Sequence, residues 1–461
     1  MQTTHTDTIA APATAQSIAA IALIRVSGPV AISSVFNIFK PLKKGLTADT
    51  IESHKAYFGN ITDGDKPIDE VLVTFFKGPN SFTGEDTAEI SCHGSLFIQN
   101  EVLRLLMHHG ARLAQPGEFT MRAFMNGRMD LSQAEAVADV IASTSAAQHR
   151  LAIQQLKGGF SKEIARLRQE LIDFAALIEL ELDFGEEDVE FADRTRLTTL
   201  VTDIKQAVDS LAQSFAYGNA IKNGVPVVIA GKPNAGKSTL LNALLNEERA
   251  IVSDIAGTTR DTIEEVMVID GISFRFVDTA GLRDTTDTIE MIGVERSYQK
   301  IKNAAVLLYM FDASTGNDAA DLAEEAATAA GFSIPYVLLA NKSDVADPAV
   351  LAQIEHHKNA IPISAKNNYG IEVLKDRLIQ LSGIAENTGS ELVVTNLRHY
   401  EALKNASAAL DKVNTGIANR TSGDFLAIDL RQALYHLGEI TGQITPEDIL
   451  GSIFSRFCIG K

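Results

Sequence analysis

The first part of the chain alternates short apolar runs with polar loops. Three β-branched runs, at Ile21–Val26, Glu70–Phe76 and Glu89–Cys92, have the length and composition of strands. A helical pattern also occurs here and ends at Gly110, a residue type that commonly terminates helices. Residues 1–118 are therefore predicted to form a compact α+β domain.

The spacing of apolar residues becomes helical from residue 119 to residue 217 and is helical again from 384 to 461. In the first of these segments, apolar residues recur at three- and four-residue steps and form one stripe that requires a partner helix. The residues of this stripe are Ile164, Leu167, Leu171, Phe174 and Ile178. Neither helical segment has much length to close a core alone, so we expect the two to form one discontinuous domain.

Residues 218–383, between the helical segments, alternate strands with helices, which is the pattern of a doubly wound α/β domain. Two apolar runs, Glu264–Ile269 and Ile272–Val277, flank Asp270-Gly271, a dipeptide typical of two-residue hairpins. This hairpin would place one antiparallel edge pair on an otherwise parallel sheet. The expected fold class is a multidomain combination of α/β and α+β: an N-terminal α+β domain and a discontinuous helical domain into which this α/β domain is inserted.

The composition of the chain indicates its number of domains, its suitability for nucleic-acid binding and its cellular location. The length of 461 residues suggests about two to four domains, and 59 acidic against 41 basic residues give a formal net charge of -18. Because phosphate contacts draw mostly on Lys and Arg, nucleic-acid binding would need a partner or a local basic patch. Two cysteines, Cys92 and Cys458, cannot build a disulfide framework. We expect a cytoplasmic protein without signal peptide or membrane helix.

The α/β domain begins with a loop suited to phosphate binding. An apolar run at 227–230 leads directly into Gly-Lys-Pro-Asn-Ala-Gly-Lys-Ser at 231–238. Gly231 and Gly236 let backbone N–H groups approach phosphate oxygens, while Lys237 can reach the terminal phosphates. The Ser238 hydroxyl can ligate Mg²⁺, and the following helix directs its positive end at the same anions. This segment predicts a nucleotide hydrolase.

Further motifs follow in the order that a GTPase requires, at residues 257–261, 278–281, 341–344 and 364–366. Asp278 ends a strand, where its carboxylate can hold a magnesium-bound water, and the Gly281 N–H can sense the terminal phosphate. Asp344 ends the segment Asn-Lys-Ser-Asp and can accept from the ring N–H and the exocyclic amine of guanine. Adenine offers no such pair of donors, so the sequence predicts GTP rather than ATP. The inserted α/β domain is therefore expected to be a Ras-like P-loop GTPase domain.

The residue that orients the attacking water is not where Ras-type enzymes carry it. Their glutamine follows the glycine that corresponds to Gly281, but Leu282 stands here, and an aliphatic side chain cannot orient water. Without an obvious arginine finger in cis, a monovalent cation could supply the missing positive charge. Asn234 in the phosphate loop either helps to hold that cation or only shapes the loop. The candidates for orienting water are Asp284, Asp287 and Glu290.

Taken together, these motifs resemble those of the MnmE (TrmE) family of tRNA-modifying GTPases. The resemblance extends over the whole chain and includes the insertion of a GTPase domain into a helical domain. Besides the phosphate loop, it rests on Gly-Thr-Thr-Arg-Asp at 257–261, Asp-Thr-Ala-Gly-Leu-Arg at 278–283, and Phe-Cys-Ile-Gly-Lys at 457–461. Three N-terminal segments also match the family, at 80–86, 116–120 and 126–131.

The resemblance implies a specific function. Members of this family are homodimers that work in a heterotetramer with MnmG (GidA), a partner that contains FAD. Together they install a carboxymethylaminomethyl or aminomethyl group at carbon 5 of the tRNA wobble uridine, using a 5-formyl- or methylene-tetrahydrofolate as one-carbon donor. GTP hydrolysis stimulated by K⁺ drives opening and closing of the paired GTPase domains. We expect tRNA to bind mainly through the complex, with no membrane involved.

The resemblance also assigns roles to residues of the GTPase domain. Glu290 becomes the residue that orients the attacking water, and Lys237 and Asp278 are the other expected catalytic residues. Mg²⁺ would be held by Ser238 and Thr259, and K⁺ by Asn234, Ser253, Ile255 and Thr258. The expected GTP-binding set is Asn234, Ala235, Gly236, Lys237, Ser238, Thr239, Ser253, Ile255, Thr258, Thr259, Asp278, Thr279, Ala280, Gly281, Asn341, Lys342, Asp344, Ser364, Ala365 and Lys366.

In the remaining chain, the resemblance makes residues 1–118 a folate-binding and dimerisation domain. Residues 119–217 and 384–461 are then the two halves of the helical domain, and 218–383 the GTPase domain. Arg25, Glu89, Arg128 and Lys461 would contact the folate. Cys458 is either a small buried hydrophobic residue or a thiol beside the folate and the uridine, where it would take part in the modification.

Two other functions compete with this one. A ribosome-assembly or signalling GTPase switch would use the nucleotide only to time its release from RNA, but this acidic chain shows no appended basic RNA-binding domain. A folate-dependent transferase that acts alone would need no GTP site. The complete set of guanine-nucleotide motifs therefore favours a regulatory GTPase of tRNA modification.

Overall fold

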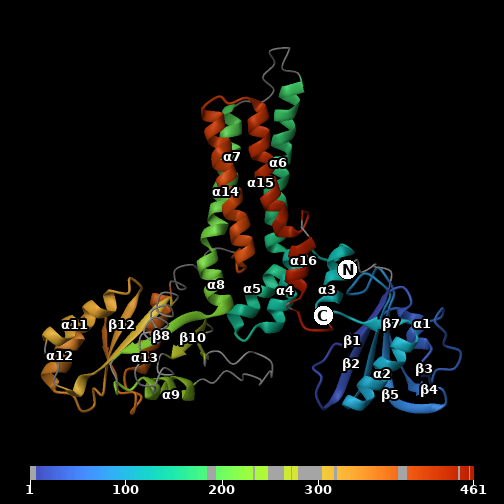
Figure 1. The fold of residues 1–461 in the computed structure, drawn as a ribbon, viewed down its shortest axis with the longest axis horizontal. Helices are drawn as coiled ribbons and strands as arrows, with labels where there is room; N and C mark the ends of the chain where they lie inside the picture. Colours follow the sequence, from blue (N-terminus) through green and yellow to red (C-terminus); the bar gives the residue numbers. More distant parts are fainter. Residues whose placement is uncertain are drawn as a thin grey trace, which may run out of the picture. The chain divides into compact units, whose positions relative to one another are not determined.

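The computed structural model describes residues 7–183, 194–231, 234–247, 264–270, 272–278, 304–315, 319–382, 392–444, 447–455 and 457–460. The chain separates into two compact units. One contains residues 1–138, 155–168 and 437–461, and the other contains residues 139–154 and 169–436. The helices and strands of both units are labelled in Figure 1.

A seven-stranded sheet forms the centre of the first unit, in the order β3-β4-β5-β6-β2-β1-β7. Its neighbouring strands are antiparallel except for β1 and β7, which are parallel. The strands are β1 Thr8–Pro12, β2 Ala19–Ser27, β3 Phe39–Pro41, β4 Lys55–Asp63, β5 Lys66–Phe76, β6 Thr87–Gly94 and β7 Ala111–Leu113. The three strands and the helix expected in this region are confirmed as β2, β5, β6 and α2 (Leu96–His108).

Alternation of side chains decides which face of this sheet is the core. On β5, for example, Val71, Val73 and Phe75 are buried while Leu72 is exposed. The buried set packs against helices α1 (Ala31–Phe36) and α2, which lie on that face. The opposite face of the central strands carries Arg25 of β2 and Glu89 of β6, two of the expected folate residues.

The first unit continues into helices that pack beside the sheet. An apolar cluster joins Leu131 and Ala134 of α4 to Phe454 of α16 and to Phe457 just after it. Met121 and Phe124 of α3 pack against the same cluster. The bounds of these helices are α3 Glu118–Met125, α4 Leu131–Ala142 and α16 Glu447–Phe454. The C-terminal segment thereby becomes part of the N-terminal unit.

Long helices from both halves of the chain form the helical domain. In the second unit α7 packs lengthwise against α14, and Ser407 of α14 donates to Asp209 of α7. All five residues of the apolar stripe expected on α6 are buried. These contacts confirm that the helical domain is discontinuous in sequence. The helices are α5 Ala146–Leu156, α6 Gly159–Asp183, α7 Arg194–Gln213, α8 Phe215–Asn223, α14 Leu397–Ala418 and α15 Gly423–Thr441.

The α/β part of the second unit is a six-stranded sheet in the order β13-β12-β11-β8-β10-β9. All its pairs are parallel except the hairpin of β9 and β10, as expected from Asp270-Gly271. Its strands are β8 Val225–Gly231, β9 Glu264–Ile269, β10 Ile272–Asp278, β11 Val306–Asp312, β12 Tyr336–Asn341 and β13 Ala360–Pro362.

Apolar side chains on both faces of this sheet pack against helices. Leu240 of α9 and Leu374 of α13 belong to one core, whereas Ala329 of α11 and Ile354 of α12 belong to another. This two-sided burial explains why the strands read as continuous apolar runs in the sequence. The helices are α9 Lys237–Glu247, α11 Ala319–Ala330, α12 Pro348–His356 and α13 Ile371–Leu381, with a 3-10 turn at Ala313–Thr315.

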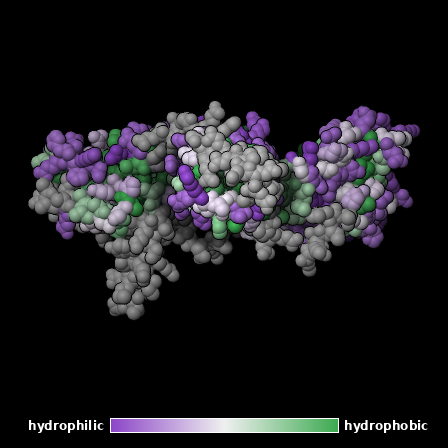
Figure 2. Space-filling model, turned by 90° about the horizontal axis from the view of Figure 1, so that it is seen from above, coloured by the Kyte–Doolittle hydropathy of each residue, from purple (hydrophilic) through white to green (hydrophobic). Residues whose placement is uncertain are grey.

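The described surface is mixed in character. In the view of Figure 2, hydrophilic residues are interspersed with smaller hydrophobic groups over both units. Among the helices that the structure describes, none combines the length and the apolar composition needed to cross a bilayer.

Candidate functional site

The phosphate loop begins where β8 ends and finishes at the first residue of α9. Gly231 has φ +139°, and a Cβ there would lie 1.9 Å from the carbonyl oxygen of Met310 on β11. Gly236 has φ +100°, and a Cβ there would lie 2.2 Å from Nδ2 of Asn341. Both glycines are therefore required by close backbone approach as well as by their conformation.

Lys237 and the helix start give this loop its positive potential. The Lys237 ammonium donates to the carbonyl oxygen of Gly231 at 2.8 Å, so its charge lies across the loop. Ser238 and Thr239 are the next residues of α9, and the N–H groups of this first turn have no carbonyl partners within the helix. The arrangement fits a nucleotide polyphosphate with Mg²⁺ held at the Ser238 hydroxyl.

Asn341 ties the phosphate loop to the loops expected to bind the guanine. It is the last residue of β12, and its side chain is only 4% exposed. Its Nδ2 donates to the carbonyl oxygen of Ala235 at 2.7 Å, and its Oδ1 accepts from the N–H of Ala365 at 3.0 Å. One amide thus satisfies two loops that are more than a hundred residues apart in sequence.

The remaining guanine-loop residues lie beside this amide. Lys342, with φ +63°, forms an ion pair with Asp312 at the end of β11. Burial raises the pKa of Asp312, but hydrogen bonds from Lys342 and from Ser314 prevail and lower it. Asp344 is exposed, as a carboxylate that receives a base must be. Ser364 and Lys366 flank Ala365, so the structure brings both motifs together as expected.

Other expected residues have fewer described contacts, and some lie outside the described part of the chain. Asp278 is the last residue of β10, beside the phosphate-loop strand. Asn234 has φ +60° and is exposed in the phosphate loop. The following expected residues lie outside the described part of the chain: Ser253, Ile255, Thr258, Thr259, Thr279, Ala280, Gly281, Asp284, Asp287, Glu290 and Lys461.

A second polar site lies on the open face of the N-terminal sheet. Arg25 of β2 and Glu89 of β6 are cross-strand partners. Both Nε and Nη2 of Arg25 contact Oε1 of Glu89, each at 2.9 Å. The guanidinium also lies over the ring of Phe82 at 5.1 Å and over that of Phe119 at 5.7 Å. The expected pair is thus in direct contact and is held by two aromatic rings.

Arg128 reaches the same region from the turn between α3 and α4. Its side chain is exposed, and its aliphatic stem lies against Gly84, where an added Cβ would be 3.3 Å from Cγ of Arg128. Gly84 and Phe82 belong to one loop, residues 80–86, which we call the Phe82 loop. The Phe82 loop therefore contacts both arginines: Gly84 lies against Arg128, and the Phe82 ring lies against Arg25.

The C-terminal tail is seated on the N-terminal sheet. The N–H of Gly117 lies 3.5 Å from the carbonyl oxygen of Cys458. Gly460 has φ +95° and leaves no room for a side chain, since a Cβ would lie 2.0 Å from the carbonyl oxygen of Pro12. Pro12 pairs with Ile24, the neighbour of Arg25. Cys458 itself is exposed, so its interpretation as a buried hydrophobic residue is wrong.

The comparisons with known proteins agree with this geometry. Two family models match the chain, "GTP-binding protein TrmE N-terminus" over residues 8–128 and "MnmE helical domain" over residues 131–458. The tRNA modification GTPase MnmE of Cytophaga hutchinsonii is 53% identical over 100% of this chain and 99% of its own length. The chain belongs to the MnmE family of tRNA modification GTPases.

Other relatives extend the match. The MnmE proteins of Flavobacterium psychrophilum and Bacteroides fragilis are 50% and 49% identical, each over 99% of this chain and 99% of its own length. Among solved structures, a variant of Aquifex aeolicus Era bound to GDP and AlF4⁻ is 30% identical over 40% of this chain and 66% of its own, with a TM-score of 0.28. As a member of the MnmE family, the chain is a GTPase involved in tRNA modification.

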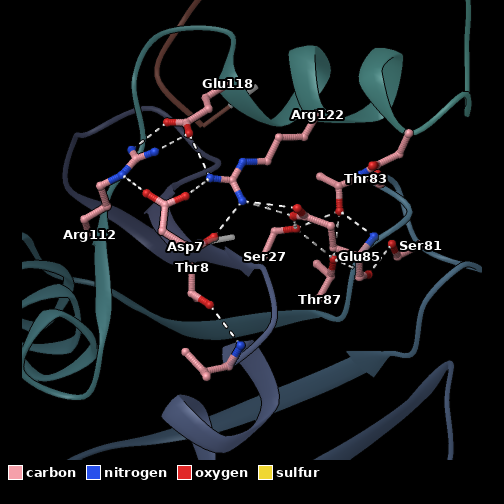
Figure 3. Close-up of polar contacts among 12 residues, drawn as sticks. Asp7, Thr8, Ser27, Ser81, Thr83, Glu85, Thr87, Arg112, Glu118 and Arg122 are labelled. Atoms are coloured by element: carbon pink, nitrogen blue, oxygen red, sulfur yellow. Dashed lines mark hydrogen bonds and ion pairs between the residues drawn. The ribbon is translucent and has the colours of Figure 1, made fainter. Parts of the chain in front are cut away.

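The N-terminal domain of this MnmE-family chain contains an ionic cluster that the sequence did not reveal (Figure 3). At its centre is Arg122 of α3, which is only 2% exposed. Its Nη2 donates to Asp7 at 2.7 Å and to Glu118 at 3.0 Å, and its Nη1 contacts Glu85 at 3.2 Å. Arg112 of β7 contacts Asp7 and Glu118 as well. Three carboxylates therefore surround two guanidinium groups.

The cluster lowers the pKa of two of its carboxyl groups. Burial alone raises the pKa of Glu118, but hydrogen bonds from Arg112, from the Gln115 N–H and from Arg122 outweigh it. The same balance lowers the pKa of Asp7, where the hydrogen bonds come from Arg112 and Arg122. Both groups thus favour their charged forms in the folded chain.

Other contributors also escaped the sequence analysis. Phe82 and Phe119 lie under Arg25, and Asp312 pairs with Lys342. Asp312 carried a positional signal, since it ends the apolar strand run of β11 at the edge where the nucleotide motifs gather. Phe82 and Phe119 lie in the segments 80–86 and 116–120 that match the family, but nothing in their spacing indicates a guanidinium partner.

The ionic cluster predicts that α3 becomes less stable in acid. Carboxyl groups with a lowered pKa stabilise the fold above their ordinary pKa of about 4, and this contribution is lost as the pH falls through the lower folded values. Hydrogen exchange of the α3 peptides, corrected for intrinsic rates, should show constant protection between pH 7 and 5 and a decline below about pH 4.

The variant Glu118→Gln should lower the opening free energy of α3 at pH 7 by about 3 kcal/mol, because it leaves the buried Arg122 and the partly exposed Arg112 short of one charge. It should also reduce the acid dependence. Glu163→Gln is the matched control, since Glu163 pairs with Arg166 on one turn of α6. Equal acid dependence in Glu118→Gln and the unmodified chain would contradict this account.

Proposed function

We propose that the chain is a K⁺-stimulated GTP hydrolase that modifies carbon 5 of the tRNA wobble uridine together with the FAD-containing partner MnmG (GidA). The product would carry a carboxymethylaminomethyl or aminomethyl group, and a 5-formyl- or methylene-tetrahydrofolate would supply one carbon. The observation that carries the proposal is the second site, where Arg25, Glu89 and the Cys458 tail converge in a chain that also holds a guanine-nucleotide site. A simple switch GTPase has no use for such a site.

The chemistry of Glu89 fits the ring of a folate. A pterin carries a ring N–H beside an exocyclic amine, the same pair of donors that an aspartate recognises in guanine. Both contacting nitrogens of Arg25 engage Oε1 of Glu89, which leaves Oε2 able to accept from the ligand. Arg128 and, by resemblance, Lys461 would supply positive charge for folate carboxylates. The exposed thiol of Cys458 is suited to act on the modification intermediate, although its role rests on the resemblance.

The nucleotide chemistry would be shared between metal ions and the protein. Ser238 and Thr259 are the proposed Mg²⁺ ligands, and Asn234, Ser253, Ile255 and Thr258 the proposed K⁺ ligands. The exposure of Asn234 and its left-handed backbone suit a loop oxygen that faces a ligand. Glu290 would orient the attacking water, because Leu282 cannot. GTP hydrolysis would then drive the domain movements of the complex.

Exposed apolar side chains support the proposal of a homodimer. Phe58 of β4 and Leu72 of β5 are exposed cross-strand neighbours, and Ile21 of β2 is exposed as well, whereas Ser91 of β6 separates Leu72 from the half-buried Leu23 of β2. Exposed apolar residues of this kind are typical of contact surfaces. The dimer would bind two MnmG chains and form a heterotetramer. Because the acidic chain has little charge complementarity with tRNA, tRNA would be bound mainly by the complex. We expect this complex in the cytoplasm.

Hydrolysis should depend on K⁺ and on Glu290. Replacement of K⁺ by Na⁺ should lower kcat, because the proposed cation supplies charge that an arginine finger gives in other GTPases. Glu290→Ala should lower kcat about a hundredfold or more while the Kd for GTP stays nearly unchanged. Asp287→Ala is the matched control and should keep most activity. Cation-independent turnover, or full activity of Glu290→Ala, would refute these roles.

Modification of the wobble uridine is tested by nucleoside analysis of tRNA from a deletion strain. The strain should lack the modified nucleoside, and the unmodified gene should restore it. Arg25→Ala should fail to restore it although its GTPase rate is retained, because Arg25 belongs to the folate site alone. Lys55→Ala, which breaks an exposed ion pair with Glu52, is the control and should restore it. Full modification in the deletion strain would refute the proposed function and favour a ribosome-assembly or signalling GTPase switch.

A further inference from the structure

The Phe82 loop, residues 80–86, touches both arginines of the candidate folate site. Its Phe82 ring lies under the Arg25 guanidinium, with 5.1 Å between the guanidinium carbon and the ring centroid. Its Gly84 lies against the stem of Arg128. The position of this one loop therefore sets the surroundings of both positive charges.

Polar contacts fix this loop to the domain beneath it. The Glu85 carboxylate accepts from Ser27 Oγ at 2.7 Å and from Arg122 Nη1 at 3.2 and 3.3 Å. Thr83 Oγ1 lies 2.7 Å from the same Ser27 hydroxyl, and Asn126 donates to the Thr83 carbonyl oxygen at 2.8 Å. Ser27 follows Arg25 by two residues on β2, so the anchor and the site share one strand.

Glu85 is the charged member of this anchor. Arg122 is buried, so its attraction for a nearby carboxylate is weakly screened by water. Of the three carboxylates around Arg122, Glu85 alone belongs to the Phe82 loop, whereas Asp7 precedes β1 and Glu118 begins α3 (Figure 3). Removal of the Glu85 charge would leave Arg122 paired with Asp7 and Glu118. The domain would then stay folded while the loop loses its charged anchor.

We propose that Glu85 is the positioning residue of the candidate folate site: its contacts with Arg122 and Ser27 hold the Phe82 loop so that Phe82 supports Arg25 and Gly84 supports Arg128. This inference rests on the proposed folate site. Glu85 does not touch the folate in this account, and it acts through the loop. It differs in this respect from Glu89, which would bind the ligand directly.

The test combines ligand binding with a reporter of loop position. Because the chain contains no tryptophan, Phe82→Trp introduces a single indole whose fluorescence anisotropy reports the order of the loop. The experiment uses the full-length chain, with and without Phe82→Trp, and compares each form with its Glu85→Gln variant. Binding of 5-formyltetrahydrofolate is measured by calorimetry for every one of these proteins. Glu85→Gln should raise the folate Kd about tenfold, since hydrogen bonds to charged groups carry effects of this size. It should lower the indole anisotropy and leave the Kd for GTP nearly unchanged.

Asp86→Asn is the matched control. Asp86 is the next residue and accepts from the N–H of Gly78, but it contacts neither Ser27 nor Arg122 in the described structure. It should leave both folate binding and anisotropy unchanged. Arg25→Ala should abolish folate binding, because it removes a proposed ligand contact itself. Unchanged folate binding in Glu85→Gln would overturn the inference. A raised Kd with unchanged anisotropy would overturn it too, because Glu85 would then act on the ligand directly.

Failure of the proposed function gives a different result. If the unmodified chain does not bind 5-formyltetrahydrofolate at all, the folate site is refuted whatever Glu85 does. The anisotropy comparison would still decide whether Glu85 holds the Phe82 loop.

Discussion

The close contact between the C-terminal tail and the first strand of the N-terminal sheet is the constraint on which the second site depends. Gly460 packs against the Pro12 carbonyl oxygen with no room for a Cβ, and the preceding Phe457 is buried among residues of α3, α4 and α16. This contact brings the C-terminal tail to the strand that pairs with the Arg25 strand, although more than four hundred residues separate them in sequence. In the sequence, most of the helical and GTPase residues come between two chain segments that belong to one unit.

The nucleotide site follows a simpler rule, because parallel strands present their carboxyl ends at one edge of a sheet. Gly231, Asp312 and Asn341 are the last residues of β8, β11 and β12, which are neighbours in the sheet. The Asn341 amide then joins the phosphate loop to the guanine loop, and Lys342 and Asp312 pair beside it. A single sheet edge thus carries both the phosphate loop and the loops expected to bind the guanine.

Local signals in the sequence predicted most of the fold. Asp270-Gly271 located the β9–β10 hairpin, and the apolar stripe of α6 was recognisable because helical spacing is a local property. The Arg122 cluster was not predictable, since its partner Asp7 lies 115 residues away and no spacing rule links a buried arginine to such partners. The same holds for Phe82 beneath Arg25. The resemblance to the family assigned Arg25 and Glu89 to one site, but their cross-strand contact required the sheet register.

The most direct test of the account is whether folate shields Cys458 from alkylation. Burial, together with the charge of Asp69, raises the pKa of the Cys92 thiol to about 11, so iodoacetamide should modify the exposed Cys458 and spare Cys92. Saturating 5-formyltetrahydrofolate should slow the modification of Cys458 about tenfold or more, and Arg25→Ala should remove this protection. An unchanged rate at a folate concentration that calorimetry shows to be saturating would contradict the claim that the tail and the N-terminal sheet form one site.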